Sequence, residues 1–400
     1  MRKTIYFSLC LCLIFSCTKY DDDIQFDVQD YKTLTPENIQ TNLKVANLIL
    51  SQDDFDEMYA NYTEDIEIEG LFSLYKDGAV LIQSEVVQVE IKGQASAANE
   101  LKSLGIMFND NFNNEDRKLI NSETFSSHSL DQIKAFRFRN SGNDFFETMI
   151  KDLSYTKLAI NAGLNLDLTY GEQTVVFVNN DFLGVMNLRT EANAYGVSRL
   201  YGVSENEITL AKISIPGIIV KKNGDFARID NFISAIEVGD YNYLKEEIDI
   251  DNFIDYMIFE SYIANRDWPM NNVRFFAVNQ GPFRFVLYDL DLATTYYIDD
   301  CPMSFIQNHP AQNPITDLFN IMYSQLEFKE MYDMRFENLM NSGSLGSSAF
   351  NTIVNEYKEN IEHAMPFQIE KYNTPGSFTE WYLNIEHLKN NFESRENYVW

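Results

Sequence analysis

Apolar positions between residues 253 and 297 predict a helix, a polar break and a hairpin in succession. Residues 253–264 repeat apolar side chains with helical spacing, and this pattern stops at the polar triplet 265–267. Residues 273–278 and 283–288 then alternate apolar and polar side chains around an Asn-Gln-Gly-Pro turn, which is typical of a two-stranded hairpin. We therefore expect this stretch to place a polar loop beside the end of a strand.

The rest of the pattern predicts strands in the N-terminal half and helices in the C-terminal half. Short alternating runs separated by turn residues precede residue 140, and an Asn-Asn-Asp turn joins the two strands of a hairpin over 174–188. From residue 243 onward the spacing is mostly helical. We expect an α+β protein with a polar tether over 18–50, an antiparallel-strand-rich α/β lobe over 51–240 and a mostly helical lobe over 241–400.

The first 17 residues have the form of an export signal. Two basic residues precede an apolar stretch over 5–15, which is too short for a stable membrane span. Residues 13–17 read Leu-Ile-Phe-Ser-Cys and resemble a bacterial lipobox, so Cys17 is the predicted lipidation site; an ordinary signal peptide with an incidental cysteine is the alternative. The Lys-Tyr-Asp-Asp-Asp run that follows resembles the tether of surface lipoproteins in Bacteroidetes-type bacteria. We expect an exported outer-membrane lipoprotein at the cell surface, held to the membrane by lipid alone.

Composition narrows the class of protein. A formal charge of −29 excludes a nucleic-acid-binding protein, which needs a basic face. A hydrophobic content of 45% and an aromatic content of 14% indicate a well-packed globular chain. Cleavage before Cys17 would leave Cys301 as the one other cysteine, so no intrachain disulfide is expected. The four histidines have no metal-ligand spacing, and a zinc site is therefore not expected.

Three acids and an amide gather in the stretch that follows the predicted helix at 253–264. Asp267 and Asn272 have the Asp-x4-Asn spacing of a kinase catalytic loop, and Asp289 and Asp291 come at the end of the second strand. Phosphoryl transfer uses such a set, because one carboxylate orients the attacking hydroxyl while others hold metal ions against the phosphates. A helix-capping Asp267 and a turn Asn272 are the structural alternative. The acid pair is the stronger signal, because two adjacent carboxylates repel each other without a cation.

Four stretches, taken together and in order, resemble the CotH-type kinases, a family named for a spore-coat protein. Residues 138–144 are similar to its Leu-Arg-Asn-Gly-Gly-x-Asp segment, and residues 176–188 resemble its Asn-Gly-containing hairpin. Residues 265–276 resemble its Asn-x-Asp-Trp-x-x-Asn-Asn segment, and residues 287–293 its Trp-Asp-x-Asp-x-Thr segment. The resemblance runs from about Glu64 to the C-terminus. It implies a divergent, two-lobed protein-kinase-like fold that uses ATP with Mg²⁺ or Mn²⁺.

The resemblance also implies a role for each acid and amide. Asp267 would be the catalytic carboxylate that faces the acceptor hydroxyl. Asn272 would bind metal or phosphate. Asp289 and Asp291 would supply the metal-binding carboxylates, and the sequence does not decide which of the two is the principal ligand.

The nucleotide-binding half of the implied site departs from the family pattern. The family's Arg-Gly-Asn-Ser-Ser-Arg loop is here Lys-Gly-Gln-Ala-Ser-Ala over 92–97, in which Ser96 remains as a phosphate contact. Lys102, after this loop, would contact the α- and β-phosphates. The glutamate expected to pair with Lys102 falls at Thr190 by spacing, and Glu191 lies one residue further on. One residue rotates a helical side chain by about 100°, which puts the Lys102–Glu191 pair in question.

Two functions fit these observations. The first is an ATP- and Mg²⁺-dependent kinase that acts on a protein or glycan hydroxyl at the cell surface. The second is a catalytically silent surface lipoprotein that uses the same fold to bind carbohydrate or a protein partner. The two differ in geometry, because an active site requires the carboxylates of Asp267, Asp289 or Asp291 to converge, with Lys102 facing them.

Overall fold

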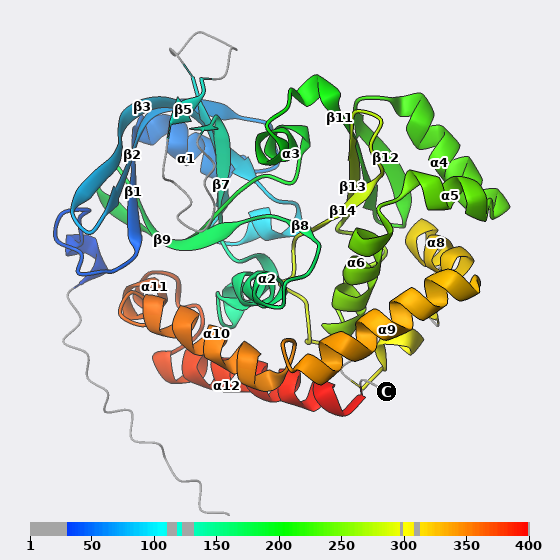
Figure 1. Cartoon of the computed structure of the whole chain (residues 1–400). Coiled ribbons are helices and arrows are strands. Elements are labelled where there is room, and N and C mark those ends of the chain that lie inside the picture. Colours follow the sequence, from blue (N-terminus) through cyan, green and yellow to red (C-terminus); the bar gives the residue numbers. More distant parts are fainter. Residues whose placement is uncertain (1–29, 110–117, 122–131, 297–298, 308–312, 399–400) are drawn as a thin grey trace, which may run out of the picture.

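The fold combines a closed β-barrel with a separate five-stranded sheet, and helices join and cover both (Figure 1). The computed structural model describes residues 30–109, 118–121, 132–296, 299–307 and 313–398. The expected α+β class is confirmed. The predicted signal peptide and its lipidation site, Cys17, lie outside the described residues.

Seven strands form the barrel, in the order β1-β2-β3-β4-β7-β10-β9. Their bounds are β1 (Lys44–Leu50), β2 (Glu67–Lys76), β3 (Ala79–Lys92), β4 (Ser103–Phe108), β7 (Ala135–Arg139), β9 (Gly171–Val178) and β10 (Asp181–Arg189). All neighbours are antiparallel except β1 and β9, whose parallel pairing closes the barrel. β1 lies within the region expected to be a tether, so that expectation is wrong for residues 44–50.

Strand alternation decides which side chains enter the barrel. β7 reads Ala-Phe-Arg-Phe-Arg, and its two phenylalanines are buried while its arginines are half-buried on the outside. Phe136 and Phe138 pack against Phe72 with ring centroids 5.3 and 6.1 Å apart. The expected Asn-Asn-Asp turn joins β9 to β10, and Asn179 and Asn180 adopt φ values of 51° and 69° there. The barrel interior is thus aromatic, and Arg137 and Arg139 are left for other contacts.

The second sheet has the strand order β12-β11-β13-β14-β8. Its strands are β8 (Asp167–Leu168), β11 (Ile208–Ser214), β12 (Ile218–Asn223), β13 (Val273–Val278) and β14 (Arg284–Leu287). The predicted hairpin of residues 273–288 is β13 and β14. Because β11 pairs with β12 and β13, residues 208–223 belong to the same sheet as the β13–β14 hairpin. The expected boundary at residue 240 therefore does not separate the two sheets.

Helices cover both faces of the five-stranded sheet. α3 (Ala194–Tyr201) lies against one face, where Val197 packs with Leu210 and Phe276. α4 (Phe226–Val238) and α6 (Ile250–Tyr262) lie on the other face, where Phe232 contacts Phe275 and Phe283. The shorter elements near the barrel are α1 (Gln52–Ala60), η2 (Ala95–Ala98), β5 (Ile120–Asn121), β6 (Gln132–Ile133), η3 (Gly142–Phe146) and α2 (Lys151–Asn161).

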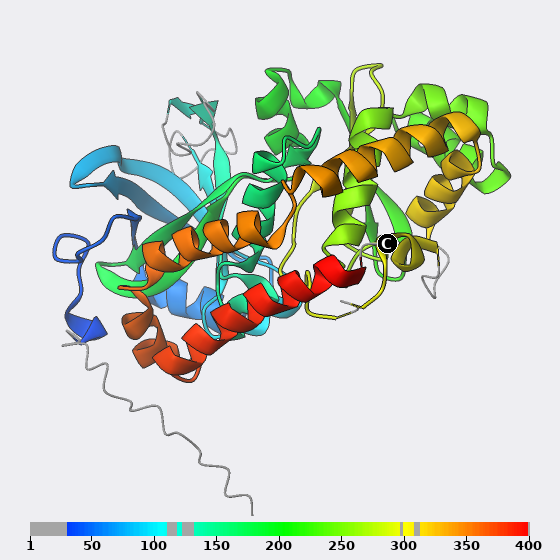
Figure 2. The ribbon, with the colours of Figure 1, turned by 60° about the horizontal axis from the view of Figure 1, so that its bottom comes forward.

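The C-terminal helices extend below both β-structures (Figures 1 and 2). Together with the short helices before them, they are α5 (Tyr241–Glu247), α7 (Pro302–Gln307), α8 (Pro314–Tyr323), α9 (Leu326–Ser342), α10 (Ser347–Ile361), α11 (Met365–Tyr372) and α12 (Phe378–Arg395). α10 and α12 lie side by side and contact α2 through stacked rings, with Phe350 4.8 Å from Tyr155 and 4.1 Å from Phe392. Among the described residues, no helix has both the length and the apolar character needed to span a bilayer.

A buried arginine at the end of α12 holds the end of α6. Arg395 donates from Nε to the carbonyl of Tyr262 at 2.7 Å and from Nη2 to the carbonyl of Ser261 at 3.0 Å, and it also donates to the carbonyl of Asp300. Terminal carbonyls of a helix lack intrahelical donors, and a guanidinium satisfies them and the helix dipole together. Arg395 therefore fixes the point at which the chain leaves α6 and enters the acid-containing loop.

Candidate functional site

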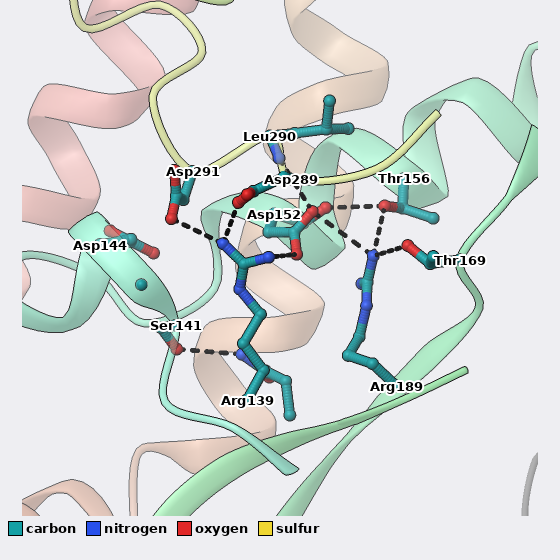
Figure 3. Close-up of polar contacts among 12 residues, drawn as sticks. Arg139, Ser141, Asp144, Asp152, Thr156, Thr169, Arg189, Asp289, Leu290 and Asp291 are labelled. Carbon is teal, nitrogen blue, oxygen red and sulfur yellow. Dashed lines mark hydrogen bonds and ion pairs between the residues drawn. The ribbon is translucent and has the colours of Figure 1, made fainter. Parts of the chain in front are cut away.

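The two strand-end acids converge on a single guanidinium nitrogen (Figure 3). Arg139, on the outside of β7, donates from Nη2 to Asp291 at 2.7 Å and also to Asp289. Asp289 follows β14 and has a φ of 64°, a left-handed conformation that is unfavourable for most residues other than glycine. Such strain persists where the surrounding structure requires it, and it is common in functional sites. The predicted acid pair thus forms one binding position for positive charge.

Asp291 is held by the loop that follows β7. Its carboxylate accepts the main-chain N–H of Asn143 at 2.9 Å and the side-chain amide of Asn143 at 3.2 Å. Gly142 has a φ of +62°, and a Cβ atom there would lie 2.0 Å from Oδ2 of Asp291. Glycine is therefore required at position 142 both for the backbone conformation and for the approach of the carboxylate. The segment 138–144, which carries part of the family resemblance, forms one wall of the site.

A second buried ion pair lies behind the first. Asp152, on α2, lies 3.7 Å from Nη1 of Arg139 and 3.4 Å from Nη2 of Arg189. Arg189, at the end of β10, also donates to Thr169 at 2.7 Å. Burial raises the pKa of Asp152, but Arg189 and Arg139 outweigh it and lower that pKa overall. Asp152 therefore stays ionised and increases the negative charge around Arg139.

Negative charge exceeds positive charge at the acid pair. Burial, followed by repulsion from Asp289, raises the pKa of Asp291 to about 7, although Arg139 opposes this rise. Burial disfavours the charge on Arg139, but Asp289, Asp152 and Asp291 hold its pKa well above the ordinary value. Arg139 and Arg189 thus supply two guanidiniums for the three carboxylates of Asp152, Asp289 and Asp291. The site retains capacity for a further cation.

Asp267 and Asn272 lie in the loop that joins α6 to β13. The Asn272 amide donates to Asp267 Oδ2 at 3.4 Å, and Asn272 has a φ of 56°. Burial and then the charge of Asp289 raise the pKa of Asp267, so the two carboxylates are close enough to interact. The structure therefore brings Asp267, Asn272, Asp289 and Asp291 into one region.

A buried glutamate that no sequence pattern singled out lies close to this loop. Glu260, on α6, is fully buried and accepts a hydrogen bond from the Asn265 amide at 2.9 Å. Its other carboxylate oxygen has no hydrogen-bond partner within the described part of the chain, and neither has the indole N–H of Trp268. Burial raises the pKa of Glu260 to about 8, with Asp289 and Asp152 contributing. At neutral pH Glu260 is therefore protonated and uncharged.

The Glu260→Gln variant is expected to gain stability relative to the wild type as the pH rises from 5 to 9. The folded pKa of about 8 lies above the ordinary glutamate pKa of 4.5, so the wild type loses stability as the pH rises between these values. The loss reaches about 5 kcal/mol at most, at about 1.36 kcal/mol per pKa unit. Melting temperatures of both proteins across this pH range test the prediction, with the exposed Glu237→Gln as control. Parallel curves for the wild type and Glu260→Gln would contradict it.

Lys102 and Glu191 do not pair, and the expected ion pair is wrong. The Lys102 ammonium donates to the carbonyls of Ala97 at 2.8 Å and Asn99 at 3.0 Å, and it lies 4.1 Å from the centroid of the Tyr62 ring. The Glu191 carboxylate instead accepts from Nε and Nη2 of Arg137 at 3.2 and 3.0 Å. Lys102 is therefore held within its own loop. Arg137, an outward arginine of β7, binds Glu191 instead.

The loop that contains Ser96 lies over the wall formed by residues 140–142. The Ser96 carbonyl accepts from the Asn140 amide at 3.1 Å, and the Asn99 amide donates to the Gly142 carbonyl at 3.3 Å. The Asn140 amide also donates to the carbonyl of Leu101 at 2.6 Å. The small-residue loop thus packs close to the acid pair, although the lysine that follows it faces elsewhere.

Four residues of the site were not selected from the sequence: Arg139, Asp152, Arg189 and Glu260. One of them, Arg139, could have been placed from the sequence pattern. The Phe-Arg-Phe-Arg run of β7 alternates strictly, so burying its phenylalanines puts Arg139 on the face opposite the core. The partners of Arg139 depend on contacts across 150 and 152 residues, which periodicity does not reveal.

The donor set fits a magnesium ion. In nucleotide sites Mg²⁺ is bound by one or two protein carboxylates together with phosphates and water. Asp289 and Asp291 supply two convergent carboxylates, and the guanidinium between them occupies a position where positive charge is stabilised. Within the described ranges, no group of three or more His, Cys, Asp and Glu side chains is placed to hold a metal ion. A nucleotide would have to supply the remaining ligands.

Fold and site together define an α+β protein that presents strand-end carboxylates to a cation. The chain belongs to the CotH kinase family: the family model described as CotH kinase protein matches residues 89–399. This match confirms the resemblance found in the four sequence segments. It also covers the site residues assigned above, from Ser96 to Asp291. Among curated proteins, none matches the chain significantly.

Proposed function

We propose that this protein is a kinase that transfers the γ-phosphate of ATP, with Mg²⁺ or Mn²⁺, to a hydroxyl group of a protein or glycan. The observation that carries the proposal is the convergence of Asp289 and Asp291 on one cation position beside Asp267. Membership of the CotH kinase family supports the same reaction class. We further assign the barrel and the helical part to the two lobes of a divergent kinase-like fold.

Each residue has a distinct task in this proposal. Asp267 accepts the proton of the acceptor hydroxyl and orients its oxygen, and the Asn272 amide holds the Asp267 carboxylate in place. Asp289 and Asp291 hold the metal ion, which when bound neutralises charge on the transferring phosphate. Asn143 and Gly142 position Asp291 from the barrel side. Arg139 keeps the acid pair together in the absence of nucleotide.

The proposed location is the cell surface. The segment ending at Cys17 has the composition of a lipoprotein signal, and the acidic run that follows it resembles a surface-export tether. A kinase anchored there would meet its acceptor outside the cytoplasm. Labelling of Cys17 with a fatty-acid probe tests the anchor independently of the activity.

A catalytically silent binding module is the second candidate, and two observations favour it. The Lys102 ammonium is bound by two carbonyls and a tyrosine ring, so it does not face the acid pair. Arg139 already occupies the position between the two carboxylates. Such a module would keep the acid–arginine cluster for stability and bind carbohydrate or protein elsewhere.

Isothermal titration calorimetry of the chain from residue 18 onward with ATP separates the two candidates. The kinase is expected to bind ATP in the presence of Mg²⁺ and to lose that binding in EDTA, because the acid pair holds nucleotide through the metal. A protein that binds ATP is then tested for transfer of the labelled γ-phosphate to a mixture of acceptors. A folded protein that does not bind millimolar ATP with Mg²⁺ would overturn the kinase proposal and leave the binding module.

A further inference from the structure

Three basic side chains cluster on the five-stranded sheet next to the candidate catalytic loop. Lys212, on β11, lies directly opposite Arg274 on β13 and opposite Val220 on β12. Lys222 comes two residues after Val220, at a point where the β11–β12 register shifts. Burial and then the charges of Lys222 and Arg274 lower the pKa of Lys212, which places the three cations within electrostatic reach of one another.

The fold does not neutralise this cluster. Within the described ranges, no carboxylate forms an ion pair with Lys212 or Lys222, although the chain has 60 acidic residues against 31 basic ones. The neighbouring Lys221 does have a partner, because it points to α4 and binds Asp230 at 2.9 Å. Arg274 donates to the carbonyl of Ala192 and lies 4.7 Å from the centroid of the Tyr288 ring, and its Nε has no hydrogen-bond partner in the described chain.

Like charges directly opposite each other on a sheet are destabilising. Lysines on an edge strand have a protective role against strand-to-strand aggregation, which accounts for lysines on β12. It does not account for Lys212 or Arg274, because β11 and β13 are inner strands of the sheet. Lys212 and Lys222 have no carboxylate partner within the described ranges, and Arg274 contacts a carbonyl and a tyrosine ring, so this face suits a negatively charged ligand.

This cluster is directly connected to the candidate catalytic residue. Arg274, on β13, follows Asn272 by two residues, and Asn272, which precedes the strand, donates to Asp267. The β11–β12 turn reaches the same loop, since a Cβ atom on Gly217 would lie 3.3 Å from the end of Met270. A ligand on the cluster would therefore extend toward Asp267.

The hairpin also offers groups that suit an extended polypeptide. β12 is the outer strand of its sheet, so one row of its backbone groups has no strand partner in the described part of the chain. Ile215 and Ile218, at the turn, are 71% and 58% exposed. Recognition by an edge strand combines main-chain hydrogen bonds with contacts to alternate side chains. Cations on the sheet face and apolar groups at the turn would then select acidic and apolar residues of the ligand.

We propose that Lys212, Lys222 and Arg274, together with the β11–β12 turn, dock an acidic polypeptide segment that carries the acceptor hydroxyl. The proposal rests on the kinase function assigned to Asp267 and specifies its substrate class. Nucleotide phosphates are a poorer match for this surface. Lys212 lies two strands from β14, which precedes Asp289, and that separation is about 10 Å.

Fluorescence anisotropy in the absence of nucleotide tests the docking step by itself. The probe is a labelled peptide of about 12 residues in which Asp and Glu alternate with Ile around one Ser, a length that spans an edge strand. Its comparison is the same peptide with Lys in place of each acid. The chain from residue 18 onward is expected to bind the acidic peptide, with affinity that falls as salt is added, and not the basic one.

Variants that remove charge from one face of the sheet at a time test which face binds the peptide. Lys212→Gln with Lys222→Gln is expected to weaken acidic-peptide binding at least about tenfold, because both charges face the peptide. Lys221→Gln is the matched control: it removes the same charge from the same strand on the opposite face, and it is expected to leave binding within about twofold. Equal loss in both variants, or no loss in the double variant, would overturn the proposal.

The remaining outcomes keep docking and catalysis distinguishable. A protein that binds the acidic peptide but transfers no phosphate retains the docking surface and loses the kinase proposal. A protein that phosphorylates the basic peptide and does not bind the acidic one retains the kinase and loses the docking surface. Displacement of the acidic peptide by millimolar ATP in EDTA would assign the cluster to nucleotide and overturn the docking proposal.

Discussion

Arg139→Ala is expected to lower the free energy of unfolding by about 3–5 kcal/mol at pH 7, because it leaves buried carboxylates without their cation. Asp291 is 3% exposed and Asp152 is 3% exposed, so water does not replace the guanidinium. The loss should be smaller at pH 5 than at pH 7, since Asp291, with a pKa of about 7, is protonated at the lower pH. Urea denaturation at the two pH values measures both effects.

Divalent cations give the Arg139 prediction a second readout. If the acid pair is a metal site, millimolar Mg²⁺ or Mn²⁺ should raise the melting temperature of Arg139→Ala more than that of the wild type, because the guanidinium no longer competes. Arg137→Ala is the matched control: it lies two residues earlier on the same face of β7, pairs with Glu191 and is 30% exposed. Its loss is expected to be about 1 kcal/mol. An equal response of all three proteins to Mg²⁺ would contradict the metal assignment.

Asp289→Asn is expected to weaken Mg²⁺-dependent ATP binding at least about 100-fold while the protein remains folded, because the variant lacks one of two metal-binding carboxylates. Asparagine tolerates the left-handed backbone of position 289, where φ is 64°, and Arg139 keeps its bond to Asp291. Calorimetry of the variant, with and without EDTA, measures the change.

Asp77→Asn is a closely matched control for Asp289→Asn. Asp77 has a φ of 50°, is exposed in the β2–β3 turn and undergoes the same chemical change without touching the site. It should bind ATP as the wild type does. Unchanged binding by Asp289→Asn beside a wild type that binds would show that nucleotide is held elsewhere.

The parts of the fold that follow from local pattern were predictable from the sequence. The β13–β14 hairpin and the β9–β10 turn each depend on a few adjacent residues, namely alternating side chains and turn residues that accept positive φ. The family resemblance assigned Asp267, Asn272, Asp289 and Asp291 to one site, because its motifs keep their order along the chain, and that assignment stays a prediction. These are short-range signals, and a single sequence contains them.

The parts that failed depend on contacts between distant segments. β1 was assigned to a tether because nothing near residues 44–50 indicates that β9, more than 120 residues later, pairs with it. The Lys102–Glu191 pair was implied by the family resemblance and put in question by counting along the chain, and the outward face of β7 brings Arg137 to that glutamate. Glu260 was overlooked because a glutamate inside an apolar helix gives no sign of its burial until the neighbouring elements are in place.

The capping of α6 by Arg395 has a consequence for the order in which the site is completed during folding. Tyr262 and Arg395 are separated by 133 residues, so this contact closes a very long loop. Closing such a loop costs conformational entropy before its contacts stabilise the fold, and long-range contacts of this kind slow folding. The hairpin that carries Asp289 can form early from local pairing, but the exit from α6 toward Asp267 becomes fixed only when α12 docks. Completion of the proposed active site is thus expected to be a late event, dependent on α12 rather than on the segment that contains the acids.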